Sequence, residues 1–379
     1  MVMGELEQET ELLVIGGGPG GYAAAFRGAD LGMDVTLLDA AARPGGVCLY
    51  EGCIPSKSVL FLSELIFDAQ RAEKMGITFG RPKIDLEQLQ QWKQAVIDRM
   101  ASGLVTLSRE RGVQLLQARA TFEDAHHVRL SGGEVRRIRF AHAVIATGSR
   151  PIALPQAPFS AAGRIMDAGG ALALADIPSR LLVIGGGYVG LELGSVYAAL
   201  GSRVDLVEMS DRLLPGVDAD LVAPLQRRLE NAFASIRLGT GVRRLEETAE
   251  GVTVDFDVKS AADSQLYDRV LVAIGRQPAS RELDIDNAGV RLDERGFIEV
   301  DAQRRTTVPH IYAVGDVVGG MMLAHKATRE GKVAAESIAG QAAAFDVRAI
   351  PAVVYTDPQI AWCGLSETDA RRENRPVAL

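Results

Sequence analysis

The chain has 379 residues, 47% of them hydrophobic and 24% charged, so it can bury sizeable cores and divide into about two to four domains. Its formal net charge is −8 and its basic residues cluster only in pairs, which argues against a nucleic-acid-binding surface. The first ten residues are acidic and lack an apolar signal region, and no apolar run matches a membrane span. We therefore expect no secretory signal, no transmembrane segment and a cytoplasmic location.

The first motif is a strand, glycine turn, helix and second strand over residues 11–39. An apolar strand runs into Gly16, Gly18 and Gly21, and the second strand ends at Asp39. Such glycines allow a tight turn that brings backbone amides and a helix N-terminus to a pyrophosphate, while the acid binds a ribose. Because all four parts occur in register, the segment predicts a dinucleotide site rather than an ordinary glycine-rich turn.

Two cysteines follow directly, Cys48 and Cys53 in GGVCLYEGCIPSKS. Positions five apart on a regular helix point about 140° away from each other, so a bond between them requires a distorted turn. Strained bridges are easier to reduce, which favours a redox role over a structural one. The alternative is a pair of buried thiols. Lys57 lies four residues after Cys53, on the same face if a helix opens here, where its charge could lower a thiolate pKa.

Helices are predicted next over residues 56–74 and 84–112, the second with Trp92, Val96 and Met100 as a buried packing stripe. Strands are predicted at 113–122, 126–130 and 140–149. A proline-rich run over 150–159 then indicates a link between domains.

The strand–turn–helix–strand pattern recurs over residues 181–208, with Gly185, Gly187, Gly190 and Glu208 at a constant offset of 169 residues. Two copies predict two dinucleotide sites. A carboxylate at Glu208 would repel the extra phosphate of NADP and favours NAD, although Arg203 nearby could favour a phosphate.

A third stretch contains a strand that ends at Gly315 and Asp316, and a carboxylate there can accept hydrogen bonds from sugar or ribitol hydroxyls. His325 follows, which by itself would be interpreted as a capped or surface histidine. The remaining cysteine, Cys363, is expected to be a small packed side chain.

The motifs GGGPGGY, GGVCLYEGCIPSK, ATGSRP, GGGYVGLELG, VAIGRQP and YAVGDVVGGMMLAHKA together resemble the pyridine nucleotide-disulfide oxidoreductase family, from about residue 11 to residue 367. Within the family, GCIPSK is similar to the lipoamide-directed members, and mercuric reductases share much of the pattern.

The resemblance implies an α/β fold with two Rossmann-like nucleotide-binding domains, for FAD and NAD, of three-layer ββα character, plus the start of an α+β interface domain. The expected domains are an FAD-binding domain with the redox disulfide at 1–149, an NAD-binding domain at 150–276, a central domain completing the FAD site at 277–348, and a truncated interface or dimerisation domain at 349–379.

The resemblance also implies site residues. Cys48, Cys53, Lys57 and Glu192 are the implied catalytic group, in which Cys48 exchanges with substrate, Cys53 faces the flavin and Glu192 pairs with Lys57. An exposed salt bridge with other partners is the alternative for Glu192. The implied FAD contacts are Gly16, Gly18, Gly21, Asp39, Lys57, Ala120, Thr147, Gly148, Ser149, Asp316, Met322, Leu323, Ala324 and His325. The implied NAD contacts are Gly185, Gly187, Gly190, Glu208, Val242 and Gly275, and no metal site is expected.

The implied activity is oxidation of dihydrolipoamide to lipoamide through the Cys48–Cys53 disulfide and FAD, with hydride transfer to NAD. Implied partners are a lipoyl-carrier domain, a 2-oxo acid dehydrogenase or glycine cleavage complex, and a second copy of the chain in a homodimer. Two alternatives remain: another disulfide or mercuric reductase of the family, and a catalytically impaired flavin-binding protein.

One departure from the family pattern concerns the C-terminus. Family members carry a C-terminal interface domain that supplies a His and Glu pair to the neighbouring subunit, and no histidine follows His325 here. The sequence therefore suggests a fragment of a longer product, or alternatively a natural truncation with impaired dimerisation.

Overall fold

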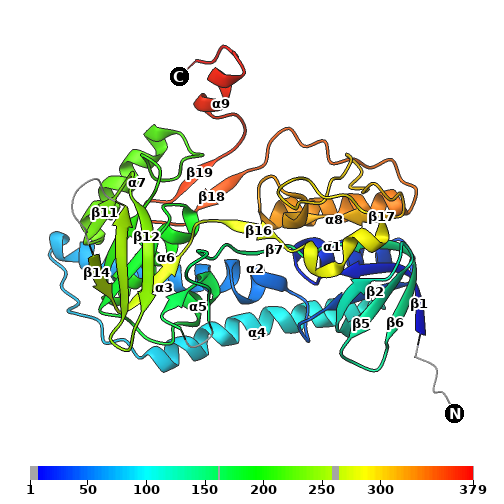
Figure 1. Ribbon diagram of the computed structural model, residues 1–379. Coiled ribbons are helices and arrows are strands. Elements are labelled where there is room, and N and C mark those ends of the chain that lie inside the picture. The colour runs from blue at the N-terminus through cyan, green and yellow to red at the C-terminus, as the bar shows by residue number, and fades with distance from the viewer. Residues whose placement is uncertain (1–6, 161–162, 258–263, 379) are drawn as a thin grey trace. The chain divides into compact units, whose positions relative to one another are not determined.

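The computed structural model describes residues 7–160, 163–257 and 264–378 (Figure 1). Residues 1–6, part of the segment for which the sequence predicts no secretory signal, lie outside this range. The chain divides into two compact units: unit 1 comprises 1–50, 97–150 and 276–350, and unit 2 comprises 51–96, 151–275 and 351–379. Thus residues 51–96, although they follow the first motif in the chain, cluster with the second nucleotide motif.

Unit 1 is built on a sheet in which β6 is the central strand. Parallel strands occur in the order β3, β2, β1 and β6, and the first half of β6 pairs antiparallel with β5 while its second half pairs parallel with β17. The strands are β1 (Glu7–Ile15), β2 (Val35–Asp39), β3 (Gln114–Gln117), β4 (Arg119–Phe122), β5 (His127–Ser131), β6 (Arg137–Ile145) and β17 (Ile311–Ala313). The C-terminal ends of β1 (residues 12–15) and β6 (residues 143–145) are continuously apolar and buried, which fits a sheet covered on both faces there.

Helices α1 (Pro19–Asp30) and α8 (Ala324–Ile338) pack against each other, side by side in Figure 1. Their contact is close because glycines face each other: a Cβ on Gly331 would lie 2.2 Å from the Gly20 carbonyl oxygen. The core on this side includes Leu12, Val14 and Val144 from the sheet. The short helix α2 (Gly46–Tyr50), the 3₁₀ turns η2 (Arg281–Leu283), η3 (Ile285–Ala288) and η4 (Gly315–Val318), and the two-stranded pair of β7 (Ser149–Pro151) and β16 (Arg276–Pro278) complete these segments.

Replacing Gly331 by Ala should therefore destabilise the protein by about 1–3 kcal/mol, since the added methyl meets a backbone oxygen that cannot rotate away. Gly103, inside helix α4 (Leu86–Glu110), is the matched control, because a Cβ there meets nothing within 4 Å. Gly103→Ala should stabilise the protein by about 0.5–1 kcal/mol. Chemical denaturation of both variants measures the difference, and equal unfolding free energies would contradict the proposed packing.

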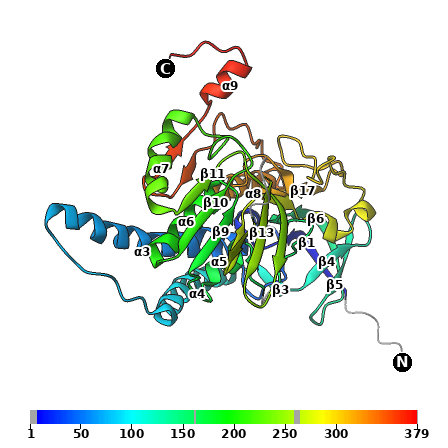
Figure 2. The same cartoon turned by 60° about the vertical axis from the view of Figure 1, so that its left-hand side comes forward.

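Unit 2 has three layers: helices, a parallel sheet and a small antiparallel sheet. The parallel order is β11, β10, β9, β15 and β8, with α6 alongside β9 and β10 in Figure 2, and the antiparallel order is β12, β13 and β14. The strands are β8 (Ile165–Met166), β9 (Arg180–Ile184), β10 (Arg203–Val207), β11 (Ser235–Arg237), β12 (Gly241–Glu247), β13 (Val252–Asp257), β14 (Ser264–Tyr267) and β15 (Arg269–Val272). The helices are α3 (Cys53–Ala72), continued by η1 (Glu73–Met75), α5 (Ala168–Ala173), α6 (Tyr188–Leu200) and α7 (Ala219–Ala232).

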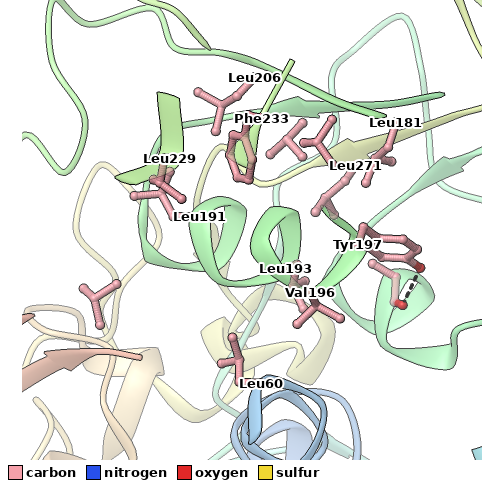
Figure 3. Close-up of a cluster of buried hydrophobic side chains, with 14 of the residues drawn as sticks. Leu60, Leu181, Leu191, Leu193, Val196, Tyr197, Leu206, Leu229, Phe233 and Leu271 are labelled. Atoms are coloured by element: carbon pink, nitrogen blue, oxygen red, sulfur yellow. Dashed lines mark hydrogen bonds between the residues drawn. The ribbon is translucent and has the colours of Figure 1, made fainter. Parts of the chain in front are cut away.

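The main core of unit 2 lies around α6, whose apolar residues are buried on almost every side (Figure 3). Leu191, Leu193 and Val196 pack with the sheet residues Leu181, Leu206 and Leu271, with Phe233 after α7 and with Leu60 of α3. The buried Tyr197 hydroxyl donates to the Ala171 carbonyl at 2.8 Å. Because a helix with apolar residues all round needs cover on all sides, α6 is enclosed by the sheet, α3, α5 and α7. The predicted α/β class with ββα layers is confirmed.

The predicted helices at 56–74 and 84–112 are confirmed as α3 and as α4 (Leu86–Glu110), but the predicted packing stripe of α4 is wrong. Trp92 and Met100 are 40% and 45% exposed, and the buried face instead carries Lys93, Ile97 and Ala101, one residue further along. Lys93 is buried because its ammonium donates to the carbonyls of Leu172 and Ala173 at the C-terminal end of α5. The sequence pattern did not indicate this face because lysine is normally exposed. Here the alkyl chain of Lys93 packs in the interior while its ammonium binds carbonyls at a helix end.

The described part of the C-terminal segment forms β18 (Ala352–Val354) antiparallel to β19 (Ile360–Trp362), followed by α9 (Glu367–Arg372). Cys363 comes directly after β19 and is exposed, so its expected packed position is wrong. The apolar residues around it do not form a closed core at that point, since Leu365 is also exposed. No helix in the described ranges is both long and apolar enough to cross a membrane.

One histidine of unit 1 should make the fold sensitive to acid. Burial, and secondarily the charge of His310, lower the pKa of His142, whose Nδ1 is buried without a hydrogen-bond partner, while Glu11 opposes the shift. Since the unfolded chain binds the proton more readily, this contribution to stability is present above the unfolded pKa of about 6.5 and is lost as pH falls through the lowered folded pKa.

His142→Leu should therefore lose less unfolding free energy than the wild type between pH 7 and pH 5. His127→Gln is the control, because the His127 ring is only half-buried and its Nδ1 has a partner, the Asp124 carboxylate at 2.9 Å. Denaturation at several pH values tests this, and parallel pH profiles for wild type and His142→Leu would contradict it.

Candidate functional site

The first glycine turn is forced by contacts within unit 1. Gly16 has φ +105° after β1, and a Cβ on it would lie 2.4 Å from the Ala146 carbonyl oxygen. A Cβ on Gly21 would lie 1.7 Å from the Gly16 carbonyl oxygen. No other residue fits these positions, so the strand can turn directly into α1 only with glycine here.

A carboxylate at the end of β2 locks this turn. Asp39 accepts hydrogen bonds from the Gly17 N–H at 2.5 Å and from the Ala41 N–H at 2.7 Å. The acid predicted to bind a ribose is thus held with a fixed orientation beside the turn.

Unit 2 repeats this geometry. A Cβ on Gly185 would lie 2.4 Å from the Ala273 carbonyl oxygen, and one on Gly190 would lie 2.1 Å from the Gly185 carbonyl oxygen. Glu208 accepts from the Gly186 N–H at 2.6 Å and from the Ser210 N–H at 2.7 Å. The duplication inferred from sequence spacing is therefore also a duplication of contacts.

Both turns offer a cradle that fits a diphosphate. Helices α1 and α6 begin after Gly18 and Gly187, and neither N-terminus receives a side-chain cap. A Cβ on Gly187 would meet nothing within 4 Å, and one on Gly18 only the Gly46 Cα at 3.9 Å, so the protein does not fill the space that these glycines leave. Uncapped N–H groups and the positive end of a helix are the donors that an anion needs.

Arg203 lies too far along β10 to compete with Glu208. It is the first residue of the strand, and Glu208 follows the last, Val207. Five residues of strand separate them by roughly 17 Å. The carboxylate therefore governs the end of the strand at which a ribose would bind.

The cysteines lie on two separate helices rather than one. Cys48 is in α2 and Cys53 begins α3, and a turn at Glu51 and Gly52 separates the two helices. Both cysteines are partly exposed. Helix α2 starts against the first glycine turn, because Gly46 has φ +58° and a Cβ on it would lie 2.6 Å from the Gly18 Cα. The distortion expected between the two cysteines is confirmed.

The pair of Lys57 and Glu192 is present in unit 2. The Lys57 ammonium lies 2.9 Å from Glu192 Oε2, and the Glu192 side chain is only 4% exposed. The backbone N–H of Tyr355 donates to Glu192 Oε1 at 2.9 Å, and Lys57 Nζ lies 4.6 Å from the centre of the Tyr355 ring. Tyr355 was not predicted from the sequence, since nothing in its neighbourhood marks it as a partner of α3 and α6.

A cavity of about 510 Å³ lies beside this pair, lined by α3, α6, α7 and residues 355–359. On its wall Arg228 binds Asp357 at 3.1 Å and lies over the Phe67 ring, and Arg71 also binds Asp357. Sequence reasoning missed these three charged residues, because they come from segments far apart in the chain. Two of them are cations and one is an anion, and the cavity wall combines apolar and aromatic side chains with polar and charged ones.

Polar groups predicted for the flavin meet at one place in unit 1. The Ser149 hydroxyl donates to Asp316 at 2.5 Å and receives a hydrogen bond from Arg276 Nε at 2.7 Å. Thr147 donates to the Ala279 carbonyl at 2.6 Å, and Gly148, between Thr147 and Ser149, has φ +72°. The serine hydroxyl is thus used to orient Asp316, and Arg276 is a further member of the group that the sequence did not reveal.

The remaining residues predicted to contact FAD or NAD lie in different structural settings. Leu323 is the N-cap of α8, without a side-chain cap, and Met322, Ala324 and His325 flank that helix start. Ala120 is buried in β4 with its methyl in the sheet core. In unit 2, Val242 packs partly buried in β12 and Gly275 has φ +124°. Within the described ranges, no group of three or more His, Cys, Asp or Glu side chains could hold a metal ion.

Comparison with known proteins places this geometry in a family. The family model described as pyridine nucleotide-disulphide oxidoreductase matches residues 10–331. The chain belongs to this family. It is thereby an oxidoreductase of a flavoprotein family whose members typically bind FAD and NAD(P).

Its relatives include dihydrolipoyl dehydrogenases. The protein of that name from Haemophilus influenzae is 45% identical over 369 residues, covering 97% of this chain and 77% of the relative. The one from Geobacillus stearothermophilus is 43% identical over 378 residues, covering 100% of this chain and 80% of the relative. The solved structure of the HOCl-induced flavoprotein disulfide reductase RclA from Escherichia coli matches with a TM-score of 0.84 and 26% identity, covering 96% of this chain and 79% of RclA.

The ion pair between half-buried Lys57 and buried Glu192 generates a stability prediction. Lys57→Met should destabilise the protein by about 1–3 kcal/mol, because it leaves the buried Glu192 carboxylate without its cation. The double variant Lys57→Met/Glu192→Gln should recover most of that loss, since no unpaired charge remains. Thermal unfolding of the wild type, both single variants and the double variant checks this, and additive losses in the double variant would exclude a direct interaction.

Proposed function

We propose that this protein is an FAD-dependent dihydrolipoyl dehydrogenase, which oxidises dihydrolipoamide to lipoamide through a Cys48–Cys53 disulfide and reduces NAD. The observation that carries the proposal is the placement of Cys48 on a helix starting against the first glycine turn and of Cys53 one helical turn before the Lys57–Glu192 pair. The names of the relatives at 43–45% identity support the same substrate.

The thiol chemistry balances between the substrate dithiol and the cysteine pair, with the two substrate thiol protons released to solvent. A substrate thiolate attacks the Cys48 sulfur and breaks the Cys48–Cys53 bond, so that Cys53 leaves as a thiolate. The second substrate thiol then displaces Cys48 and closes the substrate disulfide, which leaves two electrons on the cysteine pair. Lys57, on the same helix face as Cys53, supplies a positive charge on the side where negative charge develops.

The glycine turns would hold the two nucleotides. Gly16, Gly18, Gly21 and Asp39, together with Asp316 and the start of α8, are the proposed residues for FAD, and Gly185, Gly187, Gly190 and Glu208 those for NAD. FAD, when bound, supplies a two-electron carrier between the cysteine pair and NAD. Glu208 favours NAD because its carboxylate suits a free ribose hydroxyl and repels a phosphate.

The proposed partners follow from the substrate. The dihydrolipoamide is carried on a lipoyl domain of a 2-oxo acid dehydrogenase or glycine cleavage complex, and the protein pairs with a second copy of itself. The cytoplasmic location expected from the sequence is part of the same proposal.

Cys48→Ser should abolish NAD reduction by dihydrolipoamide while the purified protein remains yellow, because the exchange sulfur is lost but the nucleotide turns are not. Cys363→Ser is the matched control, since this exposed cysteine lies outside the proposed site, and it should retain activity. Steady-state assays with NAD and with NADP, in parallel with flavin absorbance, provide the measurement. Undiminished turnover by Cys48→Ser would refute the proposed role.

A second candidate is reduction of a different disulfide or of mercuric ion. The structural match to a flavoprotein disulfide reductase, at a TM-score of 0.84, supports this second candidate. NAD(P)H oxidation that depends on added mercuric ion or on a non-lipoyl disulfide, without dihydrolipoamide turnover, would select this reading.

A further inference from the structure

A buried ionic cluster lies beneath the turn that carries Asp316. We call it the Glu330 cluster, and it consists of Arg304, Lys326 and Glu330. Glu330 is fully buried, Lys326 is 6% exposed and the Arg304 side chain 14%. Arg304 Nη1 lies 3.0 Å and Lys326 Nζ 3.1 Å from the Glu330 carboxylate.

The cluster holds both polar groups of one glycine. The Gly315 N–H donates to Glu330 Oε2 at 2.8 Å, and Lys326 Nζ donates to the Gly315 carbonyl at 3.3 Å. Gly315 has φ +84° and follows the last residues of β17, so these side chains replace the ladder bonds that a strand residue would have. The backbone direction at Asp316, the next residue, is therefore set by Glu330 and Lys326.

Structural stability alone does not account for such a cluster. Three charges have been removed from water, with two cations for one carboxylate, and Arg304 Nε is buried without a hydrogen-bond partner. A buried ion group of this kind is often no more stabilising than apolar residues of similar volume. The surroundings could have been apolar, since α8 otherwise packs on α1 through glycine and alanine.

Asp316 is also held from its other side. Its Oδ2 accepts from Ser149, which in turn is bonded twice to Arg276, through the hydroxyl and through the carbonyl, each at 2.7 Å. The side chain and the preceding peptide of Asp316 are thus fixed by separate groups. Such two-sided support is what a residue needs when its carboxylate must meet a ligand in one orientation.

We infer that Glu330 is a positioning residue of the flavin site, which acts through the Gly315 peptide to aim the Asp316 carboxylate at the ribitol hydroxyls of FAD. The inference rests on the proposed role of Asp316 in the proposed function. Glu330 itself contacts neither cofactor nor substrate, because it is buried behind Gly315.

The test is a double-mutant cycle on FAD binding to the full chain. The dissociation constant of FAD is measured by flavin fluorescence for wild type, Glu330→Gln, Asp316→Ala and the double variant. We expect Glu330→Gln to weaken FAD binding about tenfold or more, as for loss of a charge-assisted hydrogen bond, and to have no further effect once Asp316 is replaced. Glu336→Gln is the matched control on the same helix, since its carboxylate binds Arg27 at 3.0 Å and should leave FAD affinity unchanged.

Other outcomes are also decisive. If the losses from Glu330→Gln and Asp316→Ala add, Glu330 is merely structural and the inference is overturned, while FAD binding by the wild type keeps the proposed function. If the wild type binds no FAD, both fall. If Glu330→Gln does not fold, Arg304→Gln replaces it in the same cycle, and additivity there overturns the inference. The visible circular dichroism of bound flavin should change with Glu330→Gln and not with Glu336→Gln.

Discussion

The structure depends on one interaction made twice: a carboxylate at the end of a strand accepts one backbone N–H from a glycine turn and a second from the chain just after the acid. Asp39 in unit 1 and Glu208 in unit 2 each bond the middle glycine of the turn and a residue two positions after the acid. The carboxylate holds the turn against the neighbouring strand. The position of the turn then determines where the following helix begins. Both helices start without a side-chain cap, which leaves their N–H groups for a ligand.

The close approach of chain segments at these turns has consequences further along the chain. Gly46 lies against Gly18, which fixes the start of α2 and so the position of Cys48 within unit 1. Gly331 lies against Gly20, which brings α8 to α1 and places Glu330 beside Gly315. Because these glycines have no side chains, three segments that are distant in the sequence can meet at the N-terminus of α1.

Unit 2 combines a closed apolar core with a buried carboxylate on its central helix. Helix α6 is apolar on nearly every face, and Glu192 is compatible with that setting because Lys57 and the Tyr355 N–H satisfy its two oxygens. Arg71 and Arg228 meet Asp357 in the same turn that provides Tyr355. The segment after β18 is therefore tied to α3, α6 and α7 by charge as well as by packing.

The sequence by itself determined the local chemistry of this protein: the two glycine turns with their acids, the break at the cysteines and the periodic helices. These features depend on short-range steric rules, since only glycine permits the observed φ values and contacts, and a spacing of 169 residues exposes the duplication. Tertiary structure alone decided which charges meet. The buried face of α4 escaped prediction because Lys93 pairs with carbonyls of α5, 79 residues further along. Glu330, Arg276 and Asp357 escaped it because polar contacts between distant segments leave no periodic trace in either segment.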